Sequence, residues 1–244
     1  MSASMVSVWA AIAAVVATIF AQATSVRFHQ RRAPHELAWT IALAMFALAA
    51  VALFLGDSTG WDNGTYRAFY LLGAILNVPW LAMGTIHLLA PSRIALRIRA
   101  GLIFVTGMAV GTMLASPIRG TLVAGHIPQG RYHFDALPRI LAGASSGTGA
   151  LILFSGAVIS GWRWKRRRGE AGATRLAYSN LLIATGTLVL SSGGLVKGWI
   201  AVDADEAFAM CTAIGISIVY SGFWAASARP PARSARRNTL PAKV

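Results

Sequence analysis

The sequence predicts an all-α bundle that crosses a lipid bilayer seven times, with the N-terminus outside and the C-terminus in the cytoplasm. Of the 244 residues, 56% are hydrophobic and only 12% are charged, whereas soluble domains carry about 25% charged residues. The charged residues also occur in short clusters between long apolar segments. Such a chain has too few charges to cover a surface in water, and its mean hydropathy of +0.59 agrees.

Seven apolar segments are long enough to cross a hydrocarbon core of about 30 Å, which takes about 20 helical residues. None contains Asp, Glu, Lys or Arg in its interior, and the fourth is expected to be the shortest. The predicted spans are residues 5–23, 37–56, 68–90, 100–116, 139–161, 176–196 and 207–227. Residues 1–228 therefore form the predicted membrane domain. The Pro- and Arg-rich residues 229–244 form a basic cytoplasmic tail that we expect to be disordered.

The distribution of positive charge predicts the orientation. Seventeen of the 22 Lys and Arg residues lie in the connectors 24–36, 91–99 and 162–175 or in the tail, which share one side of the predicted bundle. Because cytoplasmic loops carry the excess of Lys and Arg, we assign this side to the cytoplasm. A cleavable signal peptide ending at Ala23 is the alternative. It is disfavoured because residues 1–5 carry no positive charge.

The net charge of +14 does not indicate nucleic-acid binding, because the basic residues flank apolar segments. We expect them to determine topology and to lie against anionic headgroups of a bacterial plasma membrane, at about 1 kcal/mol per residue.

The single cysteine, Cys211, excludes an internal disulfide and a cysteine-based metal site. His126, His133 and Asp135 cluster in one loop, but their spacing matches no strong metal template. We predict no metal and no cofactor.

The third span carries the best indication of a site. Pro79 near its midpoint removes a backbone hydrogen bond and is expected to kink the helix. Arg67, Tyr70 and Asn77 share one helix face, and Trp80 is unusual at mid-membrane depth. These four residues, Arg67, Tyr70, Asn77 and Trp80, are the predicted ligand-binding residues of a cavity open to the outside. A structural interpretation stays open, in which Asn77 bonds to a neighbouring helix and Arg67 pairs with an acid.

The spans do not support a catalytic site, because the candidate nucleophile and base lie at different depths in the membrane. The fifth and sixth spans are rich in Gly, Ser and Thr, which indicates either close helix packing or a polar path. Ser145 in the fifth span and His87, the only histidine in a predicted span, differ in depth by about 20 Å at 1.5 Å per residue. A general base must come within about 3 Å of its nucleophile. We also expect no carboxylate at depth, which disfavours proton-coupled transport. The prediction is therefore a protein that is not an enzyme.

Three apolar segments near the C-terminus resemble uncharacterised multi-pass membrane proteins of actinobacteria. They are PRILAGASSGTGALILFSGAVISGWRWKRR, SNLLIATGTLVLSSGGL and DEAFAMCTAIGISIVYSGFWAA, and YRAFYLLGAILNVPWLAMGT on the third span adds to the resemblance. The resemblance implies a seven-helix membrane protein and brings no activity or ligand.

Two functions remain as expectations. The first is non-enzymatic binding or passage of a small uncharged solute or lipid. The alternative is a structural or accessory subunit of a larger membrane complex, docked on another membrane protein or on a second copy. A polar cavity reaching Asn77 favours the first function, and packing of Tyr70 and Asn77 against neighbouring helices favours the second.

Overall fold

The computed structural model describes residues 4–123, 125–166, 173–195 and 204–227, and all regular structure in this part is helical. The elements in order are α1 (Met5–Arg31), α2 (Pro34–Thr59), α3 (Asn63–Phe69), the π-helix η1 (Tyr70–Leu76), α4 (Asn77–Leu89), α5 (Ser92–Ala115), α6 (Gly130–His133), α7 (Ala136–Arg166), α8 (Ala173–Leu195) and α9 (Asp205–Ser227). The predicted tail, residues 229–244, lies outside the described residues.

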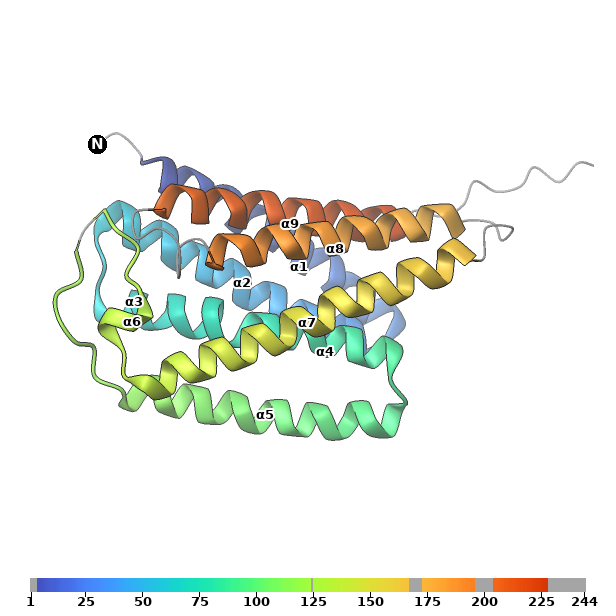
Figure 1. Cartoon of the computed structure of the whole chain (residues 1–244), viewed down its shortest axis with the longest axis horizontal. Helices are drawn as coiled ribbons and strands as arrows, with labels where there is room; N and C mark the ends of the chain where they lie inside the picture. Colours follow the sequence, from blue (N-terminus) through green and yellow to red (C-terminus); the bar gives the residue numbers. More distant parts are fainter. Residues whose placement is uncertain (1–3, 124, 167–172, 196–203, 228–244) are drawn as a thin grey trace, which may run out of the picture.

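The described chain contains seven helical segments long and apolar enough to cross a membrane, with α3, η1 and α4 joined into one segment of 27 residues. This confirms the prediction of a multi-pass helical membrane protein. The long helices lie side by side in Figure 1. We call the end where α1 begins and where residues 116–135 connect α5 to α7 the loop end, at the left of the figure. The opposite end, where α1, α4 and α7 terminate, is the basic end.

The connection between the first two helices is much shorter than predicted. Helix α1 continues to Arg31 and α2 begins at Pro34, so the expected connector 24–36 is reduced to two residues. Nothing breaks the helix at Thr24, which is fully buried and donates its hydroxyl to the Phe20 carbonyl. The turn is made at Arg32, whose left-handed backbone (φ 51°) ends α1.

The fourth span also extends further than predicted. Helix α5 has 24 residues, and the shortest candidate span is Thr174–Gly194 with 21. The predicted connector 91–99 is mostly helical, because Arg93, Arg97 and Arg99 are accommodated on the first turns of α5. Long basic side chains bury their stems and keep their charges in water, so they do not force a helix to end.

Helices α8 and α9 approach each other closely. A Cβ atom built on Gly186 would lie 2.8 Å from the backbone nitrogen of Val219, and one on Gly222 would lie 2.8 Å from the Ser179 carbonyl. Since backbone approaches backbone at these points, the small residues of the sixth span serve close packing, which was one of its two predicted meanings.

Helix α5 lies at the edge of the bundle (Figure 1). Only 11% of its apolar segment is buried, compared with 44% for α2. Its side chains Phe104 and Leu114 are 73% and 74% exposed. Around Gly101, Gly107 and Gly111 no described atom lies within 4 Å of a Cβ built there. This face is therefore available to lipid or to another helix.

Candidate functional site

The third span accommodates its proline by widening the turns that precede it. Residues Tyr70–Leu76 form a π-helix, and the Asn77 N–H bonds the Leu72 carbonyl five residues earlier. Pro79 has no N–H to donate and its ring crowds the preceding turn. The expected disruption is thus a π-helical segment, an irregularity often found at functional sites.

Among the described residues Arg67 forms no ion pair with an acid, whereas the structural interpretation of the third span expected one. Its guanidinium donates to the backbone carbonyl of Met113, near the C-terminus of α5. Asp62 instead caps α3 by accepting from the Gly64 and Thr65 amides. A cation at a helix C-terminus complements the helix dipole, so Arg67 fastens the edge helix α5 to the third span.

Tyr70 belongs to a cluster of aromatic rings that closes the loop end. Its ring lies 4.9 Å from that of Phe134, which also stacks on Tyr66 at 4.9 Å with an interplanar angle of 11°. Tyr66 is fully buried. Tyr70 also touches the backbone at Gly130, where a Cβ atom would lie 2.4 Å from the Tyr70 hydroxyl oxygen. Side chains therefore fill the loop end and block access of a ligand from that side.

Asn77 is 7% exposed, and its side-chain oxygen has no hydrogen-bond partner among the described residues. Helix α7 lies directly against this part of the third span. Ser146 donates to the Ala74 carbonyl over 2.6 Å, and a Cβ on Gly149 would lie 3.0 Å from the Val78 backbone. The surroundings of Asn77 are therefore closely packed.

Trp80 also makes a contact between helices. Its indole N–H donates to the Thr106 hydroxyl of α5 over 3.1 Å, and Thr106 donates in turn to the Leu102 carbonyl. The four predicted site residues Arg67, Tyr70, Asn77 and Trp80 thus face three different neighbours. None of them lines either cavity described next.

A cavity of about 120 Å³ lies in the basic-end half of the bundle, among six helices. Its walls are mostly aliphatic and aromatic. The lining residues are Phe20, Trp39, Leu81, Thr85, Leu88, Leu89, Leu153, Gly156, Ala157, Ser160, Asn180, Ile183, Thr187, Val219 and Phe223. Leu88 and Leu89 are themselves exposed, so one wall reaches the surface of the bundle.

Most polar groups in this cavity wall are already bonded to backbone carbonyls. The indole of Trp39 donates to Leu81 over 3.2 Å. Asn180 and Thr187 donate to carbonyls of their own helix over 2.7 and 2.8 Å. The interior therefore offers an apolar surface, and an apolar cavity of about 150 Å³ is large enough to bind benzene.

Charged groups gather beside the same cavity, at its basic end. The Arg27 guanidinium lies 4.2 Å from the centre of the Phe223 ring, and the rings of His35 and Trp39 are 5.2 Å apart. Glu36, in the first turn of α2, is only 3% exposed. The sequence placed Glu36 in the predicted connector 24–36, but the short α1–α2 turn puts it on the first turn of α2, where its side chain is buried.

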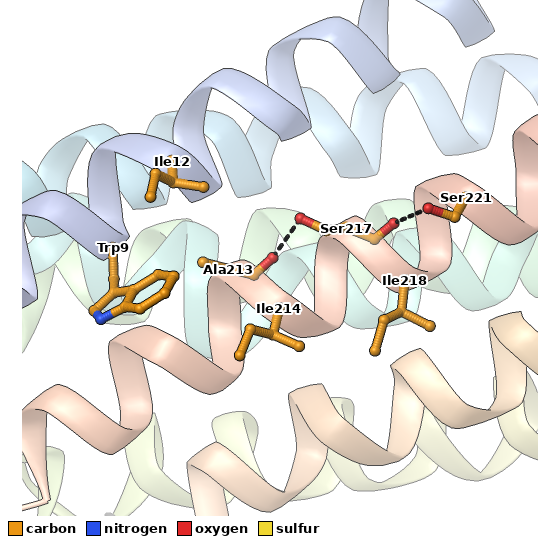
Figure 2. A pocket seen from close by; sticks show the side chains of 7 residues that line it. All are labelled: Trp9, Ile12, Ala213, Ile214, Ser217, Ile218 and Ser221. Atoms are coloured by element: carbon orange, nitrogen blue, oxygen red, sulfur yellow. Dashed lines mark hydrogen bonds between the residues drawn. The ribbon is translucent and has the colours of Figure 1, made fainter.

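A second hollow lies on the outside of α1 and α9 (Figure 2) and has a volume of about 230 Å³. Trp9, Ile12, Ile214 and Ile218 line it together with two serines, and Ala213 completes it. Ser217 donates to the Ala213 carbonyl over 2.7 Å, and Ser221 to the Ser217 carbonyl over 2.8 Å, as drawn in Figure 2. This shallow apolar surface suits bulk lipid.

The histidines of the loop end bind other protein groups. His126 lies 3.3 Å from Asp205, and His133 contacts the Arg119 carbonyl over 2.8 Å. Asp135 forms an ion pair with Arg119 at 2.5 Å. These contacts tie residues 117–135 across the loop end. The described residues contain no cluster of three potential ligands that is placed to hold a metal.

The sequence carried little signal for the basic-end cavity. Its walls come from six helices, and each contributes only one to four residues, most of them apolar residues that also suit packing. The available signal was the sequence Pro34-His35-Glu36, which places two titratable residues in the first turn of an apolar helix. No family model matches the chain, and no curated protein matches it. The resemblance to actinobacterial membrane proteins stays a prediction.

Proposed function

We propose that this chain is a non-enzymatic membrane protein that binds an uncharged, largely apolar ligand, a lipid or hydrophobic solute, in its basic-end cavity. The observation that supports this proposal is the apolar cavity, about 120 Å³ in volume, built by six helices and open to the bundle surface on one side. We further propose that the basic end faces the cytoplasm of a bacterial cell, because Lys and Arg are retained on that side.

The chemistry of the wall disfavours a polar solute. A sugar or an ion entering the cavity would lose its water, and burial without replacement hydrogen bonds costs several kcal/mol per group. The Trp39 indole N–H, the Thr187 hydroxyl and one N–H of the Asn180 amide already donate to backbone carbonyls. A hydrocarbon chain gains from the same surface, at about 0.8 kcal/mol for each CH₂ group buried.

A ligand can enter from the membrane rather than from water. Leu88 and Leu89 line the cavity and are 53% and 42% exposed at the bundle surface. In a membrane this surface contacts acyl chains. Binding therefore requires no aqueous path through the loop end, which the aromatic cluster around Tyr66 fills.

The proposal is tested by filling the cavity. We compare wild type, Ala157→Phe and the matched variant Asn77→Leu after purification in a mild detergent. Ala157 lines the cavity and Asn77 does not. We expect native mass spectrometry to find a lipid or small hydrophobic molecule retained by wild type and by Asn77→Leu, and lost from Ala157→Phe. Because overpacking costs about 1–3 kcal/mol, Ala157→Leu provides a milder filling.

Retention that does not respond to either Ala157 variant would contradict the proposal. Loss of the ligand in Asn77→Leu alone would instead return the site to the third span. Both outcomes are read only from folded, monodisperse protein.

An accessory subunit is the second candidate, and the exposed face of α5 favours it. Gly101, Gly107 and Gly111 leave open space on this edge helix, and small residues let membrane helices approach closely. A stoichiometric protein partner that co-purifies with wild type and is lost in Gly107→Leu would support this second function over the first.

A further inference from the structure

The basic-end cavity has a polar margin on the side nearest the basic end. Thr85 of α4, Ser160 of α7 and Asn180 of α8 line it there, whereas the lining residues deeper in the bundle are mostly apolar. These three residues lie about 6–10 Å from the basic ends of their helices, at 1.5 Å per residue. With the helix ends at the outer limit of the headgroups, which add about 5–7 Å to each side of the hydrocarbon core, the margin lies near the level of lipid ester groups.

The hydroxyls of Thr85 and Ser160 have unused hydrogen-bonding capacity. A Thr or Ser hydroxyl in a helix can donate to the carbonyl four residues earlier, as Thr187 does in the same wall. Neither Thr85 nor Ser160 forms a side-chain hydrogen bond with any described residue. For Thr85 the cause is visible, since the carbonyl four residues earlier, that of Leu81, already accepts the Trp39 indole N–H. Neither hydroxyl oxygen is fully buried, so a ligand in the cavity can reach both.

Asn180 adds a third polar group to this margin. One of its amide N–H groups donates to a carbonyl of its own helix over 2.7 Å, and the other has no partner among the described residues. A Cβ atom on Gly161 would lie 3.4 Å from the Asn180 Cβ, and one on Gly156 would lie 2.5 Å from the Thr85 methyl carbon. Helix α7 therefore brings Ser160 between the other two side chains.

The charge and donor balance of the wall define which polar group fits. No described residue with a formal charge lines the cavity, so a carboxylate or an ammonium group would be buried there without an ionic partner, which is costly. The unused groups include three donors, namely two hydroxyls and one amide N–H. A neutral group that accepts hydrogen bonds and brings no donor of its own matches them, and an ester presents two such oxygens.

The size of the cavity limits how much of the ligand it holds. Its volume of about 120 Å³ is slightly below the 150 Å³ or so of a cavity that binds benzene. It therefore has room for an ester group and the first few carbons of a chain. Leu88 and Leu89 line the cavity and are exposed, so the remaining carbons can extend past them into the bilayer.

We propose that the cavity binds an uncharged acyl ester, whose oxygens accept hydrogen bonds from the Ser160 and Thr85 hydroxyls. This inference rests on the proposed function and deepens it by naming the ligand class. The first carbons of the acyl chain fill the apolar interior, and the ester stays at the polar margin. The hydroxyls then select an ester over a hydrocarbon or an ether of the same length.

The experiment compares two probes that differ only in the carbonyl group. The full chain in a mild detergent is mixed with equal amounts of methyl tetradecanoate and 1-methoxytetradecane, and native mass spectrometry measures the ratio of bound ester to bound ether. We expect a ratio of about ten for wild type, because a neutral hydrogen bond contributes about 0.5–1.5 kcal/mol. Each of Thr85→Val and Ser160→Ala should lower the ratio, and the double variant should bring it close to one.

The variants have internal and external controls. Binding of the ether should change little in the double variant, which separates loss of a donor from a change of shape. Thr212→Val should keep the wild-type ratio, since Thr212 does not line the cavity and its hydroxyl donates to the Phe208 carbonyl. All three variants should fold, because the Thr85 and Ser160 hydroxyls have no described partner to lose and Thr212→Val removes one neutral hydrogen bond.

Equal retention of ester and ether by wild type would overturn the inference, as would a tenfold ratio that survives in the double variant. Displacement of the ester by an equal amount of sodium tetradecanoate would overturn the assignment of an uncharged ligand. If wild type retains both probes equally and Ala157→Phe blocks both, the lipid-binding function stands and only the ester selectivity fails. If wild type retains neither probe, the proposed function fails as well.

Discussion

The two ends of the bundle differ in how completely side chains fill them. At the loop end, Arg67 donates to the Met113 carbonyl and His133 contacts the Arg119 carbonyl, so polar atoms join helices and loop. At the basic end, an apolar cavity remains open among six helices. Polar residues on a membrane helix therefore do not by themselves indicate a ligand site. Open space among the helices is the better indicator, since the buried Tyr66 hydroxyl and the Asn77 side-chain oxygen lack partners among the described residues and yet line neither cavity.

The largest effect that this comparison predicts is at the loop end. Tyr66 is fully buried and stacks on Phe134, so Tyr66→Ala should lower the free energy of unfolding by about 3–5 kcal/mol. Tyr66→Phe should be neutral or stabilising, since the Tyr66 hydroxyl has no partner among the described residues. Thermal unfolding in detergent measures both. A decrease of less than about 1 kcal/mol in the free energy of unfolding of Tyr66→Ala would contradict a structural role for the loop end.

The next largest effect is expected when a substitution enlarges the cavity at the basic end. Leu153 lines it and is 6% exposed, so Leu153→Ala should cost about 2–3 kcal/mol, near the lower limit for such substitutions because one side is already open. It should also admit bulkier ligands, as measured by the chain length of the retained lipid. Leu151→Ala on the same helix is the control, since Leu151 is 69% exposed. Equal costs at both positions would contradict the assignment.

A smaller effect is expected where the third span holds α5. Trp80→Phe removes the hydrogen bond to Thr106 and should cost about 1 kcal/mol. Thr106→Val should cost a similar amount, and the double variant should lose little more than either single one. A double-mutant cycle on chemical unfolding checks this. Full additivity would mean that the two side chains do not interact, and ligand retention should be unchanged throughout.

The smallest effect concerns the helix cap at the loop end. A hydrogen bond from the Thr65 hydroxyl, together with the amides of Thr65 and Gly64, holds the pKa of Asp62 below its ordinary value. The cap therefore contributes stability above about pH 4 and loses it as the pH falls through the lowered pKa. Asp62→Ala should cost about 0.5–1 kcal/mol at neutral pH, and this difference from wild type should vanish in acid. Unfolding midpoints measured from pH 7 to pH 3 provide the test.

The sequence was sufficient to predict the seven spans, because hydropathy over about 20 residues reports on burial in lipid regardless of packing. It was less reliable for helix ends, since Arg93 and Arg97 can sit on a helix and still reach water. The unusual third span could be predicted from Pro79 alone. The partners of Arg67 and Trp80 could not, because both lie on α5, whose position depends on the whole bundle. The cavity had no local pattern for the same reason.

The two-residue turn between α1 and α2 has a consequence for biogenesis. With only Arg32 and Ala33 between the helices, there is no slack for α1 to settle in the bilayer while α2 is still outside it. We expect the two helices to enter the bilayer together as an antiparallel hairpin, whose facing sides the Thr40–Thr24 hydrogen bond joins in the folded protein. Glu36 follows the turn directly. It would stay at the basic end of the bundle, in the first turn of α2.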